Sequence, residues 1–329
     1  MQNQTTQEIT ITAAEKRIDS FLAKQLNIPK NQVLQLIKNS LVFLNHQPCN
    51  KGGIALKPKD IITIITPQIK SKPLIKKTDL YIQILYEDAN LLVLNKPQNL
   101  VVHHAPSVKE ETLVDWLQAK NYNLSTLSGE QRYGIVHRLD KDTTGSIVIA
   151  KDNYTHNHLA EQLKSREMGR YYLAIITPPI KENIFIECYM GRNPKNRLKM
   201  SKLDPQRFPT SRFSKSLFIP IDLSKNQDLQ LVAIKLFTGR THQIRAHLES
   251  ISRHILGDTL YGYKGEFQGR IMLHAFLLYL THPTSQKKLL FQAPVFDDML
   301  ELLEKNFDKE KINGFLQNPE NLLHLFQSH

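Results

Sequence analysis

The segment "GIVHRLDKDTTGSIVIAK", residues 134–151, joins two short apolar runs through a charged loop. The apolar runs predict two strands with the loop between them. Such connections are mostly built from small turn-forming residues such as Gly, Asn, Ser or Pro. This loop instead carries two carboxylates among three side chains that can be cationic: His137, Arg138, Asp140, Lys141 and Asp142. A loop of this composition is a candidate for chemistry as well as for chain reversal.

A calcium-binding loop is the first interpretation of these carboxylates. Asp140, Asp142, Thr144 and Gly145 fall at positions one, three, five and six of such a loop. Position twelve must supply a bidentate Glu, and here it is Lys151. Strands rather than helices are also expected on either side, so we predict no calcium site.

Asp140 is then left with two roles that its neighbours support equally. Aspartate side chains often bond their own backbone in tight turns, which Asp142 and Gly145 would suit. A carboxylate next to Arg138 is favoured in its ionised form, and an oriented carboxylate can act as a nucleophile toward an electrophilic carbon. At this level, turn-former and nucleophile both stay open.

A second candidate segment, "LFTGRTHQIRAHLESISRHILGDTLYG" (residues 236–262), reads as a strand, a Gly turn and a helix with Thr241 as its N-cap. The helix begins with basic side chains and no acidic one: Arg240, His242, Arg245 and His247. Arg opposes the dipole at a helix N-terminus, so we expect an anionic partner, either an RNA phosphate or a buried carboxylate. The histidines are five residues apart, which does not match the i, i+4 zinc spacing, and we predict no metal site.

A pair of tyrosines begins the expected strand "RYYLAIIT". Tyr171 and Tyr172 point to opposite faces because side chains alternate along a strand. One of them belongs in the core, and the other is a candidate to stack on an unpaired base in a basic cleft. Ordinary packing of both rings is the alternative.

Length and composition bound the class of protein. The chain has 329 residues, which suits two domains. It contains no apolar run long enough to predict a membrane span, and its first residues do not read as a secretory signal. Cys49 and Cys188 are too few for a disulfide framework or a thiolate zinc site. We therefore expect a cytoplasmic protein.

Positive charge is concentrated near the N-terminus. The net charge is +12, and in residues 1–78 Lys and Arg outnumber Asp and Glu by 12 to 4. Residues 14–64 predict a small unit of two helices followed by two strands, with lysines between the apolar positions. This asymmetry favours a polyanion as partner. Residues 66–79, rich in Lys and Pro, read as a linker.

The remainder of the chain predicts more strands than helices. From residue 80 the apolar runs read as strands that mostly follow one another directly, with helices expected at "ETLVDWLQAK", at "NYTHNHLAEQLKS" with Asn153 as N-cap, and from residue 296 onward. This pattern predicts an α+β (mixed) fold with a largely antiparallel central sheet flanked by helices.

Four segments in order resemble the RluA-type family of RNA pseudouridine synthases. "HRLDKDTTG" matches the catalytic signature of that family, and "LLVLNKPQNLVVHH", "TGRTHQIRAHL…ILGDTLYG" and "IMLHAFLLYLTHP" match three more of its segments. Residues 14–64 resemble the small RNA-binding module of the S-four type. The resemblance implies a division into an RNA-binding module (1–65), a basic linker (66–79), a catalytic domain (80–303) and a helical C-terminal tail (304–329).

The resemblance also implies roles for individual residues. Asp140 would be the nucleophile, Tyr172 the ring that stacks on the target base and takes part in proton removal, and Arg245 the counter-charge of the nucleophile. Residues expected to bind substrate are His137, Arg138, Ile244, Arg240, His242 and Lys96. The implied reaction turns uridine within RNA, above all large-subunit ribosomal RNA, into pseudouridine. The resemblance also implies that the protein uses no cofactor or metal, does not associate with a membrane, and is a monomer.

The chain departs from the family pattern at a few positions. Asn99 stands where Gly is usual, and it tolerates the left-handed backbone that the turn needs. His104 replaces a common Pro, "DPQRFPTSRF" lacks a usual Gly-Lys-x-Ala pattern, and Asn39-Ser40 replaces a Gly. Alternatives to the proposed activity are a transfer-RNA pseudouridine synthase, a non-catalytic RNA-binding assembly factor, and a glycosidase that pairs Asp140 with Asp142.

Overall fold

Apolar side chains at helix and strand spacing form separate cores in the N-terminal part and in the remainder of the chain. The structure is a computed structural model and describes residues 5–26, 30–66, 80–105, 108–129 and 132–327. The predicted basic linker falls almost entirely on residues 67–79, which lie outside the described residues.

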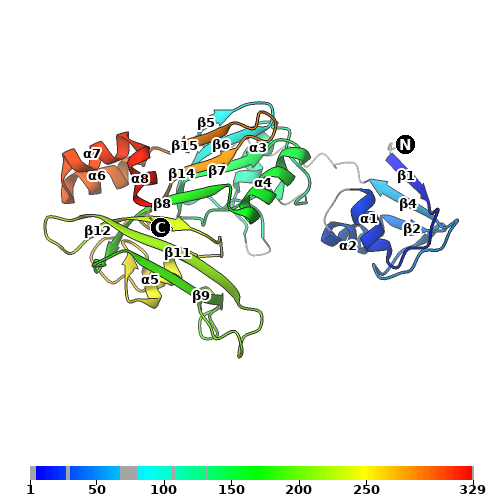
Figure 1. Cartoon of the computed structure of the whole chain (residues 1–329), viewed down its shortest axis with the longest axis horizontal. Coiled ribbons are helices and arrows are strands. Elements are labelled where there is room, and N and C mark those ends of the chain that lie inside the picture. The colour runs from blue at the N-terminus through cyan, green and yellow to red at the C-terminus, as the bar shows by residue number, and fades with distance from the viewer. Residues whose placement is uncertain (1–4, 27–29, 67–79, 106–107, 130–131, 328–329) are drawn as a thin grey trace.

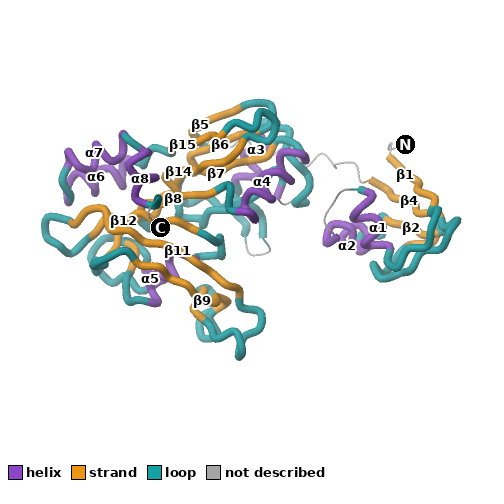
Figure 2. The backbone as a smooth tube through the Cα atoms, in the orientation of Figure 1, coloured by secondary structure: helices purple, strands orange, loops and turns teal. Residues whose placement is uncertain are grey.

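The N-terminal unit is a four-stranded sheet with two helices packed on it (Figures 1 and 2). Ile18 and Leu22 on one helix and Val33 and Ile37 on the next are buried, as their helical spacing predicts. The elements are β1 (Thr5–Thr10), α1 (Ile18–Gln25), α2 (Lys30–Lys38), β2 (Val42–Leu44), β3 (Gln47–Pro48) and β4 (Ile61–Thr66), in sheet order β1-β4-β2-β3.

Strand β1 was not predicted from the sequence. Its residues, TTQEIT, offer little apolar signal, yet the strand pairs along its whole length with β4, from Thr5 opposite Thr66 to Thr10 opposite Ile61. After α2, Ser40 takes the left-handed backbone (φ 56°) in the turn where a Gly is usual. The substitution at Asn39-Ser40 therefore leaves the turn intact.

The rest of the described chain is built on an 11-stranded sheet of order β10-β9-β11-β12-β8-β14-β7-β6-β5, with β13 added to β8 and β15 to β14. Its strands are β5 (Gln83–Glu87), β6 (Leu91–Lys96), β7 (Thr144–Ala150), β8 (Gly169–Thr177), β9 (Ile184–Arg192), β10 (Met200–Lys202), β11 (Arg212–Leu223), β12 (Gln230–Leu236), β13 (His254–Ile255), β14 (Leu273–Thr281) and β15 (Lys288–Gln292). Among the described strands only β7 and β14 run parallel. The largely antiparallel mixed sheet is confirmed.

Helices cover this sheet on both faces (Figure 1). Apolar residues of α3 (Leu113–Ala119), α5 (Gln243–Ser250) and the C-terminal helices α6 (Asp297–Asn306), α7 (Lys309–Gln317) and α8 (Pro319–Leu325) share the largest core with the central strands. Leu159 of α4 (Asn153–Ser165) belongs to a second core with β6, β7 and β14. The segment after residue 303 thus packs on the sheet, while the proposed domain division itself stays a prediction.

Some local expectations are wrong. The apolar run before the charged loop forms a single bridge, Ile135 to Ile149, and no strand. Asp152, not Asn153, caps α4, because its carboxylate accepts from the backbone N–H of Thr155 at 2.7 Å. None of the helices in the described segments has both the length and the apolar character needed to cross a membrane.

Candidate active site

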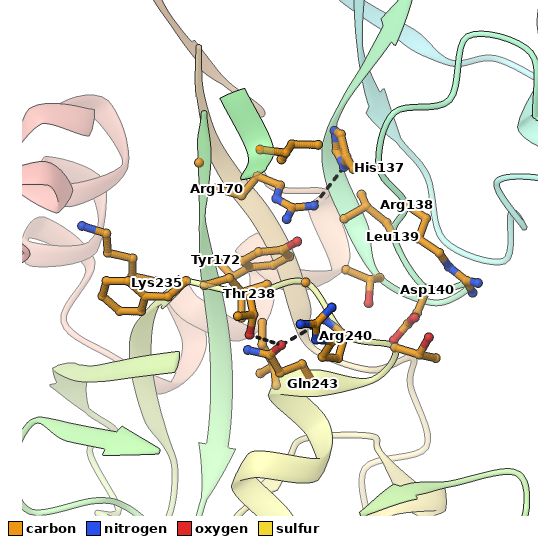
Figure 3. A pocket seen from close by; sticks show the side chains of 18 of the residues that line it. His137, Arg138, Leu139, Asp140, Arg170, Tyr172, Lys235, Thr238, Arg240 and Gln243 are labelled. Atoms are coloured by element: carbon orange, nitrogen blue, oxygen red, sulfur yellow. Dashed lines mark hydrogen bonds between the residues drawn. The ribbon is translucent and has the colours of Figure 1, made fainter. Parts of the chain in front are cut away.

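A cavity of about 520 Å³ opens where the charged loop, the start of β8 and the start of α5 meet. Figure 3 views this cavity from close by, with Asp140 and Tyr172 on different sides of it. Polar and apolar residues share its lining, as is usual for a binding site that orients a ligand. Both segments singled out from the sequence, residues 134–151 and 236–262, contribute to it.

The charged loop is held at the cavity by two features of its ends. Gly145 has φ +110° and approaches the backbone of Ala275 so closely that a side chain there would clash with it. On the other side, the fully buried ammonium of Lys96 donates to the carbonyl oxygens of Pro97 at 2.7 Å, Leu100 at 2.9 Å and Lys141 at 2.9 Å. Lys96 does not line the cavity, so the structure gives it a role in holding the loop rather than in contacting a ligand.

Asp140 points into the cavity with a side chain that is 16% exposed. Its Oδ2 lies 3.7 Å from Nη1 of Arg245 and 3.9 Å from Nε2 of His242. Within the described part of the chain, neither Asp140 nor Asp142 bonds its own loop through its carboxylate, as a turn-former would. Asp142 is also not among the cavity-lining residues. The carboxylate of Asp140 therefore faces the cavity next to Arg245 of α5 and His242, the residue just before that helix.

Arg245 is itself fixed by a second carboxylate. Its Nε and Nη2 donate to the two oxygens of Asp258 at 2.7 and 2.8 Å, and the ring of Tyr261 lies 4.6 Å from its Cζ. Burial opposes the positive charge, but Asp258 and, more weakly, Asp140 raise the pKa of Arg245 above its ordinary value. The expected anionic partner is thus two carboxylates, one held tightly and one facing the cavity.

His242 precedes α5 in a left-handed conformation (φ 52°) and replaces the expected cap Thr241. Its Nδ1 lies 3.0 Å from the hydroxyl of Tyr261, which accepts from the backbone N–H of Met200 at 2.7 Å. The hydroxyl can then donate to Nδ1, which leaves the ring hydrogen on Nε2, facing Asp140. Burial lowers the pKa of His242, against the opposing effect of Asp140, so the ring faces the carboxylate as a neutral donor.

Gln243 fixes the turn that leads into α5. Its side-chain oxygen accepts from the hydroxyl of Thr238 at 2.7 Å and from the backbone N–H of Arg240 at 3.0 Å. Its amide group donates to the carbonyl oxygen of Lys215 and to the hydroxyl of Ser216. A buried residue with all of these bonds determines where Arg240 and His242 lie.

The tyrosine pair divides as the strand alternation predicts. Tyr172 is 4% exposed and lines the cavity, where its ring is in view in Figure 3. Tyr171 packs instead against Tyr279 and Phe326, with ring centroids 5.7 and 4.9 Å away. Burial raises the pKa of Tyr172, with Arg170 opposing and Asp140 reinforcing the shift. Its hydroxyl therefore keeps its hydrogen at neutral pH.

The remaining predicted residues occupy different depths of the cavity. Ile244 is buried in its wall, whereas Arg138 is exposed at its rim. His137 is buried, and its Nε2 accepts from the backbone N–H of Val148 at 3.1 Å. Burial and the charge of Arg170 lower the pKa of His137 well below its ordinary value, so a neutral ring is expected.

A smaller cavity of about 400 Å³ adjoins the first and shares Gly239, Arg240 and Thr241 with it. Its described lining carries Arg192, Arg212 and Arg240 and no carboxylate. Part of its lining comes from "DPQRFPTSRF", the segment that departs from the family pattern.

Sequence reasoning missed three residues of the site, Asp258, Tyr261 and Arg170. The first two lie in "ILGDTLYG", which carries a family pattern but no sign of which side chain pairs with Arg245. Arg170 stands directly before the tyrosine pair, where it reads as one more basic residue. No group of three or more His, Cys, Asp or Glu that could hold a metal ion occurs among the described residues.

Comparison with known proteins assigns both parts of the chain. Residues 90–250 match the family model "RNA pseudouridylate synthase", and residues 16–62 match the S4 domain. A Helicobacter pylori protein described as an uncharacterized RNA pseudouridine synthase is 58% identical over 94% of this chain and 96% of its own length. The ribosomal large subunit pseudouridine synthase D of Neisseria meningitidis serogroup A is 31% identical over 95% of this chain and 84% of its own length.

Solved structures agree on the fold. Human RNA pseudouridylate synthase domain containing 1 superposes with a TM-score of 0.52 at 22% identity, over 68% of this chain and 95% of its own. Human RNA pseudouridylate synthase domain containing 4 gives the same TM-score at 24% identity, over 67% and 91%.

Proposed function

This chain belongs to the family of RNA pseudouridine synthases, and from that membership we propose that it converts uridine to pseudouridine in large-subunit ribosomal RNA with Asp140 as nucleophile. The reaction breaks the bond between the sugar and N1 of uracil and joins the same sugar carbon to C5. One hydrogen leaves C5 and one is taken up at N1. Nothing is oxidised and no group is donated, so the reaction requires no cofactor.

The orientation of Asp140 is the observation that carries this proposal. Its carboxylate faces the cavity with Arg245 Nη1 at 3.7 Å and His242 Nε2 at 3.9 Å. These two donors face the carboxylate from one side, and the cavity lies open to a ligand on the other. A carboxylate in such a position can stabilise or trap positive character at a sugar carbon, or attack the base, as carboxylates do in glycoside chemistry.

Tyr172 supplies the surface on which the detached uracil is retained. A base inside a helix is out of reach of side chains, so the target nucleotide must leave its stack to enter the cavity. An aromatic ring holds an extruded base by stacking, at about 1–3 kcal/mol per base. The buried ring of Tyr172 and the apolar wall at Ile244 provide such a slot.

Large-subunit ribosomal RNA is the target that several features favour. The Neisseria relative carries that RNA in its name, and the S4 domain at residues 16–62 offers a second basic contact to structured RNA. Arg138 at the rim and the arginines of the adjoining cavity suit the backbone on either side of the target uridine. We still expect this protein to be a monomer in the cytoplasm.

The geometry disfavours the alternatives raised from the sequence. A glycosidase would need a second carboxylate across the sugar, and Asp142 does not line the cavity. A non-catalytic assembly factor would have no need for the Asp258–Arg245–Asp140 arrangement, which costs the burial of three charged groups.

Mapping of pseudouridines tests the substrate. Unmodified large-subunit ribosomal RNA and unmodified transfer RNA are incubated with the purified protein, and pseudouridines are located in each. We expect formation at one or a few uridines of the ribosomal RNA. Pseudouridine formation in transfer RNA alone would show that transfer RNA, and not ribosomal RNA, is the substrate. Release of free uracil would show that the enzyme hydrolyses the bond between base and sugar instead of isomerising the nucleotide.

A further inference from the structure

Arg170 is a buried cation for which the described chain supplies no carboxylate. It lies on β8, two residues before Tyr172, is 9% exposed and lines the larger cavity. Its Nη1 lies 3.1 Å from Nδ1 of His137, and its buried Nε has no hydrogen-bond partner among the residues that the structure describes. Gly239 leaves room for the guanidinium, since a Cβ there would lie 3.0 Å from Nη2.

Other buried arginines of this chain are paired. Arg245 donates to both oxygens of Asp258, and Arg270 to both oxygens of Asp298. Burying a guanidinium without such a partner is costly, because the lost hydration is not replaced. An acceptor supplied by a ligand is the natural compensation.

The contact with His137 does not supply that acceptor. The backbone N–H of Val148 already donates to Nε2 of this ring. A neutral imidazole carries one hydrogen, so with Nε2 accepting, Nδ1 is the protonated nitrogen and has no lone pair to offer Arg170. His137 and Arg170 then form a region of the cavity that contains hydrogen-bond donors only.

We propose that Arg170 binds the carbonyl oxygen on the edge of the target uracil farthest from the sugar, and so selects uracil against cytosine. This rests on the proposed function, because it takes the sugar at Asp140 and the base on Tyr172. In Figure 3 the Tyr172 ring lies next to Arg170, and Asp140 lies well apart from both. In uridine the edge opposite the N1–sugar bond carries O4. In cytidine it carries an amino group, whose N–H donors would face the N–H donors of Arg170.

The chemistry of uracil makes this contact useful throughout the reaction. When the ring turns about its N3–C6 axis, N1 exchanges places with C5 and O4 exchanges places with O2. The edge opposite the new C5–sugar bond therefore carries a carbonyl again. Arg170 can hold the detached base before and after its rotation without forming or breaking any covalent bond, and its charge makes the hydrogen bond stronger than a neutral one.

A paired substitution of enzyme and RNA tests the contact. Single-turnover rates are measured with an RNA that carries the mapped uridine, and with the same RNA carrying 4-thiouridine there, since sulfur is a weaker acceptor. With the wild-type enzyme we expect the sulfur to slow the reaction by about tenfold or more, the size of one charge-assisted hydrogen bond. Arg170→Met should slow the uridine reaction by a similar factor and remove most of the sulfur effect.

Further variants separate this role from others. Arg170→Lys keeps the charge but loses the planar fork, so it should fold and react more slowly than wild type with uridine. Lys181→Met, an exposed cation outside the cavity lining, is the control and should leave both rates unchanged. The melting temperature of Arg170→Met should not fall, because it removes an uncompensated buried charge.

The outcomes that would overturn the proposal are distinct. An equal sulfur effect in wild type and Arg170→Met would show that this side chain does not read the base. A variant with weaker RNA affinity and a smaller salt slope, but an unchanged rate at saturating RNA, would assign Arg170 to a phosphate instead. A wild-type enzyme that forms no pseudouridine in any RNA would contradict the proposed function and not the assignment of Arg170 alone.

Discussion

Nη1 of Arg245 lies 3.7 Å from Oδ2 of Asp140, while its Nε and Nη2 donate hydrogen bonds to the carboxylate of Asp258 at 2.7 and 2.8 Å. One guanidinium thus joins a carboxylate that is 1% exposed to one that faces the cavity. Asp258 fixes the direction of the guanidinium, and the remaining nitrogen is left to orient and stabilise the charge of Asp140. The position of the proposed nucleophile therefore depends on a residue that does not touch the ligand.

Asp258→Ala should impair both stability and turnover. It leaves the buried guanidinium of Arg245 without its main partner, which for a buried pair costs about 3–5 kcal/mol of unfolding free energy. Denaturant unfolding measures this loss, and single-turnover kinetics measure the accompanying fall in rate. Asp298→Ala is the matched control, because it breaks the same kind of pair with Arg270 outside the cavity. Equal rates in the two variants would show that Asp258 does not position Arg245 for the reaction.

Tyr172→Phe should keep the binding of RNA and slow the chemical step. The substitution preserves the stacking surface and removes only the hydroxyl, which burial keeps protonated by raising the pKa of Tyr172. Single-turnover rates at saturating RNA separate the step from binding. Tyr171→Phe is the control, since that ring packs on Tyr279 and Phe326 away from the cavity lining. If both variants react at the wild-type rate, the hydroxyl of Tyr172 takes no part in proton transfer.

Arg212→Gln should reduce the dependence of RNA affinity on salt. Arg212 lines the smaller cavity, has no salt-bridge partner among the described residues, and lies close enough to Arg240 to help lower its pKa, after burial. Each phosphate contact that is lost lowers the slope of log K against log salt by about 0.7–0.9. Titrations at several salt concentrations, with Lys181→Gln as control, give the slope. A slope equal to that of the control would mean that this cavity does not contact the RNA backbone.

Stability should fall as the pH drops from about 6.5 to about 4. Burial lowers the pKa of His274 to about 4, while its Nδ1 accepts from the Thr144 hydroxyl and its Nε2 donates to the carbonyl of Ala293. The unfolded chain protonates this ring near pH 6.5, so between these values the unfolded state binds the proton and the folded state does not. The loss amounts to about 3 kcal/mol by pH 4 for one such group.

His274→Gln tests that assignment because it removes one titrating ring. The variant should show a shallower fall of unfolding free energy over this pH range, whatever its stability at neutral pH. His103 and His247, whose pKa burial also lowers to about 4, should retain their share of the fall. An unchanged slope in the variant would show that His274 titrates normally in the folded state.

The sequence predicted the elements with a strong apolar period and missed those whose partners lie far away. The helices at residues 18–25 and 153–165 and the strands on either side of residue 90 follow from spacing alone. Strand β1 could not be seen because it is stabilised by pairing with β4 rather than by its own apolar residues. Asp152 and Asn153 are equally good caps on paper, and only the backbone geometry decides between them.

The candidate site was partly visible for a similar reason. The charged loop stands out because its composition is unusual for a turn, and Asn99 was expected to take the left-handed backbone that it adopts (φ 58°). Lys96 was expected at the substrate because of its place in a family segment, but three backbone carbonyls engage its ammonium. The roles of Asp258 and Arg170 depend on side chains that are distant in sequence and close in space. A local sequence pattern does not show such neighbours.

The most direct test of the account is pseudouridine formation by Asp140→Asn under single-turnover conditions. The substitution keeps the shape of the side chain and removes the charge that faces Arg245 and the cavity. We expect RNA affinity and melting temperature close to those of wild type, with no pseudouridine formed. Pseudouridine formation at a rate near that of the wild-type enzyme would contradict the central claim that the carboxylate of Asp140 performs the chemistry.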